Sequence, residues 1–115
     1  QLPIDIKGSM IKGKVGQDIQ IEDAKKAAYL CCLNILSQLK EACDGDLNKV
    51  KNCIKITGYV NSDNNFTNQA DVLNSASELL TKVFGNSGIH ARAAISVNSL
   101  PLGAAVEIES IFEIS

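Results

Sequence analysis

One arginine and two glutamates stand out in the last quarter of the chain, because their surroundings are almost entirely apolar. Arg92 lies among alanines in the run 90–97, and Glu107 and Glu109 follow in the run 106–109. A buried charge without a partner is strongly destabilising, so an arginine in such a run requires an anion nearby. That anion is either a carboxylate of the protein, with Glu107 the nearest candidate, or a ligand. These three side chains are therefore the first candidates for chemistry.

Other polar side chains in this region rank below them. Glu109 lies two residues after Glu107 and so on the same strand face, where it is a second candidate base or a structural partner for a lysine. His90 is either a general acid next to the arginine or a partly exposed polar residue at a strand start. Ser96 and Ser99 have no histidine close to them in sequence, which argues against a serine nucleophile.

Length and composition indicate a single globular domain, 1–115, that contains enough residues to bury a core. The net charge is -2 and the lysines are scattered, so nothing favours binding to a phosphate backbone. No apolar run is long enough for a membrane span, and no signal peptide opens the chain. We therefore expect a cytoplasmic protein with no membrane contact, for which nucleic acid is an unlikely partner.

The four cysteines, Cys31, Cys32, Cys43 and Cys53, raise the questions of a zinc site and of disulfides. No C-x-x-C spacing occurs, and His90 is the only histidine, so the usual zinc ligand sets are missing. We expect reduced cysteines that act as small apolar core residues, and no metal or cofactor.

Hydrophobic periodicity predicts two helices and several strands. The first helix has Glu22 and Asp23 in its first turn and ends at 44–46, and the second runs from residue 67 or 68 to 84. Strands are expected at 1–4, 53–60, 90–97 and 104–114, with a helical turn at 47–52. The residues predicted to face the core from the helices are Ala24, Ala27, Ala28, Cys31, Ile35 and Leu39, then Val72, Leu73, Ala76, Leu79, Leu80 and Val83.

Two such helices must cover one face of a single sheet, which makes an α+β fold. In the strand 53–60, Ile54, Ile56 and Val60 are predicted to face the helices. The opposite face would then be half-polar, a character typical of a subunit interface or a ligand site. The residues assigned to this second face are Thr57, Tyr59, Arg92, Ala94, Ser96, Glu107 and Glu109.

Several motifs together resemble the Rid/YjgF family, the reactive-intermediate deaminases also labelled L-PSP endoribonucleases. They are spread over essentially the whole chain and occur in the family's order. They comprise Gln1-Leu2-Pro3-Ile4-Asp5, the helix-turn-strand segment 24–60, Asn65-Phe66, Val72-Leu73-Asn74, His90-Ala91-Arg92-Ala93-Ala94, Leu100-Pro101-Leu102-Gly103 and Val106-Glu107-Ile108-Glu109.

The resemblance implies a chorismate-mutase-like fold assembled as a homotrimeric barrel, with active sites in the clefts between subunits. It implies that Arg92 binds the carboxylate of a 2-imino acid and that Glu107 activates the water that attacks the imine carbon, giving a 2-keto acid and ammonia. Ala94 would contribute only backbone groups. Strand alternation, independently of the resemblance, makes Tyr59 a candidate to line the cleft, and Phe66 is either the hydrophobic anchor of a turn or a brace for the pocket. No cofactor is implied, because an imine is already electrophilic.

Two departures from the family pattern narrow what can be carried over. Many deaminating members have a cysteine where this chain has Ala94. Either the change is harmless, because only the backbone of this residue matters, or the substrate preference is tighter or different. Family members also have strands, and a tyrosine in the cleft, before the segment that matches Gln1, and the chain is expected to lack them. The pattern resembles a less characterised subgroup of the family.

Three functions are open on this basis. The first is hydrolysis of imine and enamine intermediates through Arg92 and Glu107. The second is RNA cleavage, against which a single histidine and a net charge of -2 both argue. The third is a trimer that binds small carboxylates or a partner without catalysis.

Overall fold

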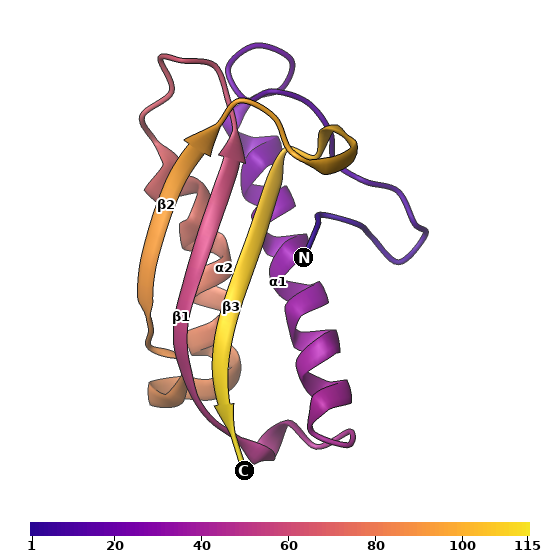
Figure 1. Cartoon of the computed structure of the whole chain (residues 1–115), viewed down its shortest axis with the longest axis vertical. Helices are drawn as coiled ribbons and strands as arrows, with labels where there is room; N and C mark the ends of the chain where they lie inside the picture. The colour runs from indigo at the N-terminus through magenta and orange to yellow at the C-terminus, as the bar shows by residue number, and fades with distance from the viewer.

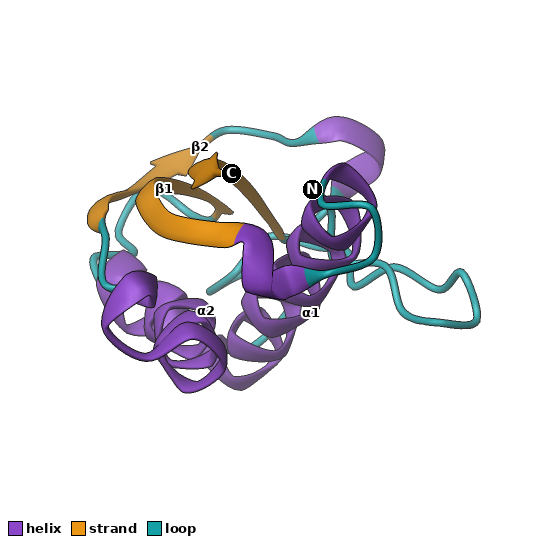
Figure 2. Ribbon diagram, turned by 90° about the horizontal axis from the view of Figure 1, so that it is seen from below, coloured by secondary structure: helices purple, strands orange, loops and turns teal.

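The computed structural model describes all 115 residues as one layer of sheet and one layer of helices (Figure 1). Strand β1 (Val50–Asn61) is central, with β2 (Ala91–Val97) parallel on one side and β3 (Val106–Ile114) antiparallel on the other. Helices α1 (Ile21–Ala42) and α2 (Gln69–Phe84) both cover the same face of this sheet (Figure 2). The predicted α+β class, with two helices on one face of a single sheet, is confirmed, and the sheet is mixed. Three short 3-10 helices complete the chain: η1 (Leu47–Lys49), η2 (Gly85–Gly88) and η3 (Pro101–Gly103).

The two helices form where the periodicity predicts them. A capping box closes the start of α1, in which Gln20 and Asp23 satisfy each other's backbone amides. All six residues predicted to face the core from α1 are buried. In α2, Leu79 is only half-buried and Val83 is 43% exposed, because the helix turns these positions outward, away from the sheet. The prediction of burial is therefore wrong for Val83.

The chain start differs from its prediction. Residues 1–4 form no strand, and their only regular pairing is an isolated bridge between Ile4 and Met10. Gln1 nevertheless exchanges two backbone hydrogen bonds with Ile108, at 2.7 and 3.1 Å, on the outer edge of β3. The backbone of Gln1 thus makes one edge contact, without the ladder of hydrogen bonds that would make residues 1–4 a strand.

Two irregularities in β1 overturn one predicted orientation. The pairing of β1 with β3 slips between Val50 and Asn52 and again between Cys53 and Lys55, where β1 has an extra residue. Such a bulge reverses the alternation of side chains. Cys53 consequently faces the helices together with Ile56, and Ile54 is 47% exposed. The sequence pattern could not show this, because a strict period of two was assumed through the bulge.

The helices lie very close to the centre of the sheet at Gly58. A β-carbon placed on Gly58 would lie 2.3 Å from Cδ1 of Leu73 in α2. Only a residue without a side chain allows this approach. Gly58 therefore marks the face of β1 that the helices cover, and the residues level with it on the neighbouring strands, Ala94 and Ile108, share that face.

This register corrects the predicted composition of the second face. Arg92 is level with Ile56 and Ser96 with Val60, both of which are fully buried under the helices. Arg92, Ala94 and Ser96 therefore lie on the helix-covered side, and the prediction that they share a face with the glutamates is wrong. The run of small residues in β2 has no polar-apolar alternation from which the correct face could be read.

The uncovered face of the sheet, which we call the open face, consists of the alternate residues. Tyr59 is level with Glu107, and Thr57 is level with Glu109. Ile95 and Ile111, 48% and 60% exposed, lie on the same side. The predicted half-polar face is thus present, with its glutamates and its tyrosine but without the arginine.

Candidate active site

Arg92 is the only arginine of the chain, and neutral groups hold it. Its Nη1 donates hydrogen bonds to Oδ1 of Asn74 at 2.9 Å and to Oγ of Ser77 at 3.1 Å. The ion pairs of the chain all involve lysines, so no carboxylate neutralises this guanidinium. The alternative that Arg92 forms a salt bridge with a carboxylate of the same chain, such as Glu107, is therefore wrong. Arg92 is exposed, and its orientation is fixed while its charge remains available to a ligand.

Helix α2 supplies both of these partners from one side. Asn74 and Ser77 are three residues apart, which places them next to each other on the helix surface, facing strand β2. Neither was singled out as a site residue from the sequence. The signal was present as an N-x-x-S spacing on the second helix, but it has meaning only once the parallel register brings Arg92 beside α2.

His90 joins the same cluster. Its Nε2 lies 2.9 Å from Oγ of Ser77, and its Nδ1 is hydrogen-bonded to the backbone carbonyl of Gly88. The ring is partly buried at the start of β2. The histidine is therefore hydrogen-bonded to a serine, but this serine is Ser77 and not Ser96 or Ser99.

The two glutamates of β3 differ in how they are used. The hydroxyl of Tyr59 donates to Oε1 of Glu109 at 2.8 Å, and this hydrogen bond raises the pKa of the tyrosine because the phenol must stay protonated to donate. Glu107 accepts no hydrogen bond and forms no ion pair within the chain, and it is partly buried. Of the two candidate bases, Glu107 is thus the one that remains free.

Arg92 and Glu107 do not meet within one chain. They lie on opposite faces of the sheet and on its two outer strands, which are about 10 Å apart because neighbouring strands are spaced by slightly less than 5 Å. The central strand, with Ile56 and Tyr59, stands between them. A reaction that uses both groups at one substrate therefore requires two chains.

Ala94 and Phe66 both pack against the hydrophobic core while remaining partly exposed. The backbone carbonyl of Phe66 accepts a hydrogen bond from the side chain of Gln69 at 3.0 Å, and the same amide reaches Oγ of Ser96 at 2.8 Å. These contacts fix the segment before α2 against the carboxyl end of β2. Ala94 lies two residues from Arg92 on the same face of that strand.

Comparison with known proteins covers the whole chain. Residues 1–113 match the family described as "YjgF/chorismate_mutase-like, putative endoribonuclease". The chain belongs to the YjgF family. Protein TCP17 of Trypanosoma cruzi is 40% identical over 116 residues, which span 100% of this chain and 72% of that protein.

Two solved structures resemble this chain to different degrees. The protein Atu1372 of Agrobacterium tumefaciens, of unknown function, is 46% identical with a TM-score of 0.97, over 100% of this chain and 74% of that one. RidA from the Antarctic bacterium Psychrobacter is 30% identical with a TM-score of 0.61, over 99% of this chain and 76% of that one. The suspected Rid/YjgF membership is confirmed, and the geometry is nearer to Atu1372 than to RidA.

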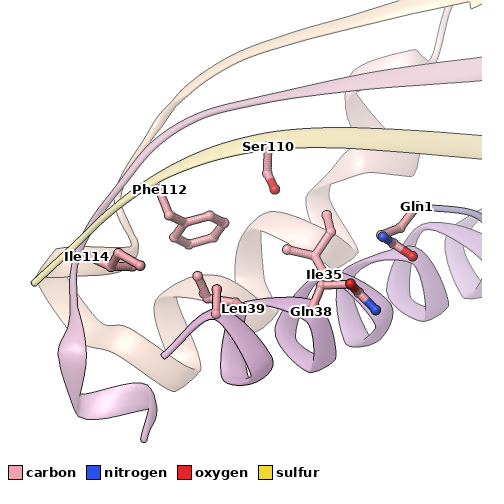
Figure 3. Close-up of a pocket in the computed structure, with 8 residues that line it drawn as sticks. Gln1, Ile35, Gln38, Leu39, Ser110, Phe112 and Ile114 are labelled. Carbon is pink, nitrogen blue, oxygen red and sulfur yellow. The ribbon is translucent and has the colours of Figure 1, made fainter. Parts of the chain in front are cut away.

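Arg92 does not line any of the five main hollows of this YjgF-family chain. One of about 280 Å³ lies between α1 and β3, where Ile35 and Leu39 face Phe112 and Ile114 (Figure 3). It has no charged side chain in its lining and offers nothing for acid-base chemistry. A smaller one of about 120 Å³ lies on the open face beside Glu109. An enclosed site at Arg92 must therefore be completed by something other than this chain.

The cysteines are free and buried. Burial raises the pKa of Cys31 and Cys32 to about 12 and that of Cys53 to about 11, because a thiolate is poorly solvated among apolar side chains. The expectation that the cysteines act as small apolar core residues is confirmed by their burial. No three His, Cys, Asp or Glu side chains gather as a metal-binding group, and neither helix combines the length and apolar character that crossing a membrane requires.

Proposed function

We propose that this protein hydrolyses reactive 2-imino acids, and the enamines in equilibrium with them, to 2-keto acids and ammonia. The observation that supports this best is the state of Arg92, a cation held in place by neutral groups and paired with no carboxylate. A guanidinium matches a planar carboxylate with two parallel hydrogen bonds, each contributing about 1.5–3 kcal/mol. Membership of a family that includes RidA supports the same substrate class.

Glu107 is the proposed base of this reaction. It would take a proton from a water molecule as the oxygen attacks the imine carbon, forming a tetrahedral carbinolamine. Glu107 would then return this proton to the nitrogen and accept the proton of the carbinolamine hydroxyl, so that the carbon-nitrogen bond breaks with loss of ammonia and the carbonyl forms. Glu107 suits this role because, unlike Glu109, it is not already accepting a hydrogen bond from Tyr59.

We propose that the two groups come from different subunits of a homotrimer. Their positions on opposite faces of one sheet rule out a shared substrate within the chain. Packing the open face of one chain against the β2 edge of the next would bring Glu107 and Tyr59 toward the Arg92 and Ala94 of a neighbour. The exposed Ile95 and Ile111 on the open face supply apolar contact area for such an interface. Phe66 would brace the part of the shared site that contains Arg92.

A coupled assay tests the activity. An amino-acid oxidase generates the imino acid, and semicarbazide traps whatever remains unhydrolysed. The protein should accelerate release of ammonia and lower the yield of semicarbazone, while Arg92→Ala should lose at least about a hundredfold in kcat/KM because two charge-assisted hydrogen bonds disappear. Lys51→Ala, which removes an exposed cation of β1, is the matched control. Equal rates for the wild type and Arg92→Ala would overturn the proposal.

Mixed assemblies test whether the site is shared. Arg92→Ala and Glu107→Gln chains, each inactive alone, should regain about a quarter of wild-type activity when co-expressed in equal amounts, because one site in four then combines both intact groups. The double variant Arg92→Ala/Glu107→Gln, co-expressed with wild type, serves as the control and should give the same quarter. If co-expression of the single variants restores nothing, the two groups do not act across a subunit boundary.

Cleavage of RNA is the second candidate, favoured by the family description alone. The cluster around Arg92 has one histidine and one arginine, whereas metal-free RNA cleavage requires a separate acid and base beside phosphate-binding cations. A gel assay at low salt, comparing wild type with Arg92→Ala and His90→Gln, tests this candidate. Cleavage that survives purification and disappears in both variants would support it in place of imine hydrolysis.

A further inference from the structure

The most unusual side-chain cluster outside the two proposed catalytic groups joins Ser77 to His90. Oγ of Ser77 lies 2.9 Å from Nε2 of the only histidine in the chain, and the same oxygen receives a hydrogen bond from Nη1 of Arg92 at 3.1 Å. The other ring nitrogen of His90 is bonded to the carbonyl of Gly88. All of these side chains except Arg92 are partly buried, where an unsatisfied polar group would be destabilising.

The directions of these hydrogen bonds follow from what each atom can donate. A backbone carbonyl only accepts, so Nδ1 of His90 must bear the proton in its bond to Gly88. In the neutral ring Nε2 is then an acceptor, and the hydroxyl of Ser77 donates to it. The lone pairs of Ser77 remain for the guanidinium. The three hydrogen bonds therefore run in one direction: Arg92 donates to Ser77, Ser77 donates to His90, and His90 donates to the backbone carbonyl of Gly88.

This chain of hydrogen bonds determines which edge of Arg92 is free. A guanidinium has five N–H groups, and the two on Nη1 are taken by Asn74 and Ser77. The remaining three, on Nη2 and Nε, have no partner in the chain. Two of them point in parallel along one edge, which is the geometry that binds both oxygens of a planar carboxylate.

We propose that Ser77 and His90 are positioning residues that hold Arg92 with its Nε–Nη2 edge toward the substrate carboxylate. This inference rests on the proposed imine hydrolysis at Arg92. Ser77 does not act as a nucleophile here. It lies within α2, where the neighbouring backbone amides are already used in helical hydrogen bonds and cannot stabilise an oxyanion.

Steady-state kinetics on variants of the full chain provide the first test. Ser77→Ala should raise KM for the imino acid about tenfold, the size of one hydrogen bond to a charged group, with kcat changed little, because the carboxylate is bound alike in substrate and transition state. Ser77→Thr, which restores a hydroxyl, should recover most of the loss. Thr81→Ala, one turn further along α2 with its hydroxyl bonded only to helix carbonyls, is the matched control and should leave KM unchanged.

Variants of the histidine test whether the two residues act as one unit. His90→Phe should match Ser77→Ala, whereas His90→Gln, whose amide oxygen can accept near the position of Nε2, should remain close to wild type. The double variant Ser77→Ala/His90→Phe should be no worse than either single variant, because both break the same chain of bonds. Additive losses, or a wild-type KM in Ser77→Ala, would overturn the inference while leaving Arg92 as the binding group.

The single histidine and single arginine also allow direct readouts. Nitrogen NMR of the imidazole should show the Nδ1–H tautomer, and adding 2-oxobutyrate should shift the Nε2 resonance in wild type but not in Ser77→Ala. Modification by phenylglyoxal reports on Arg92 alone, and 2-oxobutyrate should slow it. If the keto acid neither protects Arg92 nor is formed in turnover, the proposed function fails. If it protects Arg92 but the ring shows the Nε2–H tautomer, only the positioning role fails.

Discussion

The two faces of the sheet treat their polar groups in opposite ways. On the helix-covered face, Arg92 is the one charged side chain near the core, and uncharged oxygens of Asn74 and Ser77 orient it. On the open face, Glu107 and Glu109 lie beside Tyr59, and only Glu109 is engaged. Cation and free carboxylate are therefore kept apart by the sheet itself. The difference teaches that neither face alone brings together the cation and the free carboxylate that the proposed reaction requires.

The first test of this contrast uses the α1 thiols, which are buried between the helices and the sheet. With a pKa raised to about 12, Cys31 and Cys32 should react with a thiol reagent at pH 8 at least about a thousandfold more slowly than a free cysteine. Labelling followed by peptide mass spectrometry, with and without urea, measures this. Fast labelling of either residue in the native protein would show that the helix-covered face is open to solvent.

The next largest effect is expected on stability, from a substitution in the central strand β1. Gly58→Ala should lower the free energy of unfolding by about 3 kcal/mol, because the new methyl group would overlap the side chain of Leu73 and force α2 away from the sheet. Urea denaturation measures the loss. Lys55→Ala, on the open face of the same strand, is the control and should change stability by less than about 0.5 kcal/mol. A similar result for both variants would remove the distinction between a tightly packed and an uncovered face.

The smallest effect concerns the phenol of the open face. Because its hydrogen bond to Glu109 favours the protonated form, Tyr59 should titrate above its ordinary pKa of about 10. Any stability from this bond is present below that ordinary value and is lost as the pH rises through the raised pKa. Absorbance at alkaline pH, with Tyr59→Phe to assign the signal, should show the pKa falling back in Glu109→Gln. An unchanged titration in that variant would mean that the two side chains are not paired in solution.

Much of the fold could be predicted from periodicity because each helix has one apolar face and clear end signals. The first helix is flanked by Gln20 and Asp23 at its start and by Asp44-Gly45-Asp46 at its end. Three of the four expected strands are present, but the strand expected at 1–4 is not, and the bulge that exposes Ile54 was not predicted. A bulge depends on the partner strand, about which the local pattern carries no information.

The candidate site could be predicted only in part, for a similar reason. Arg92 and Glu107 stand out by residue type in apolar runs. Their separation by the sheet depends on the register of β2, whose alanines do not distinguish its two sides. Ser77 was missed because its partnership with His90 and Arg92 arises only when α2 packs beside that strand.

Gly88 links the packing of this fold to the location of a single proton. A β-carbon there would lie 2.2 Å from the carbonyl oxygen of Leu80, so the backbone after α2 can fit only with glycine at this position. The same residue offers the carbonyl that holds the proton of His90 on Nδ1. Close packing at the end of a helix thus fixes the position of the acceptor for this proton, and a methyl group added at Gly88 would displace that acceptor from a ring two residues away without altering any ionisable group.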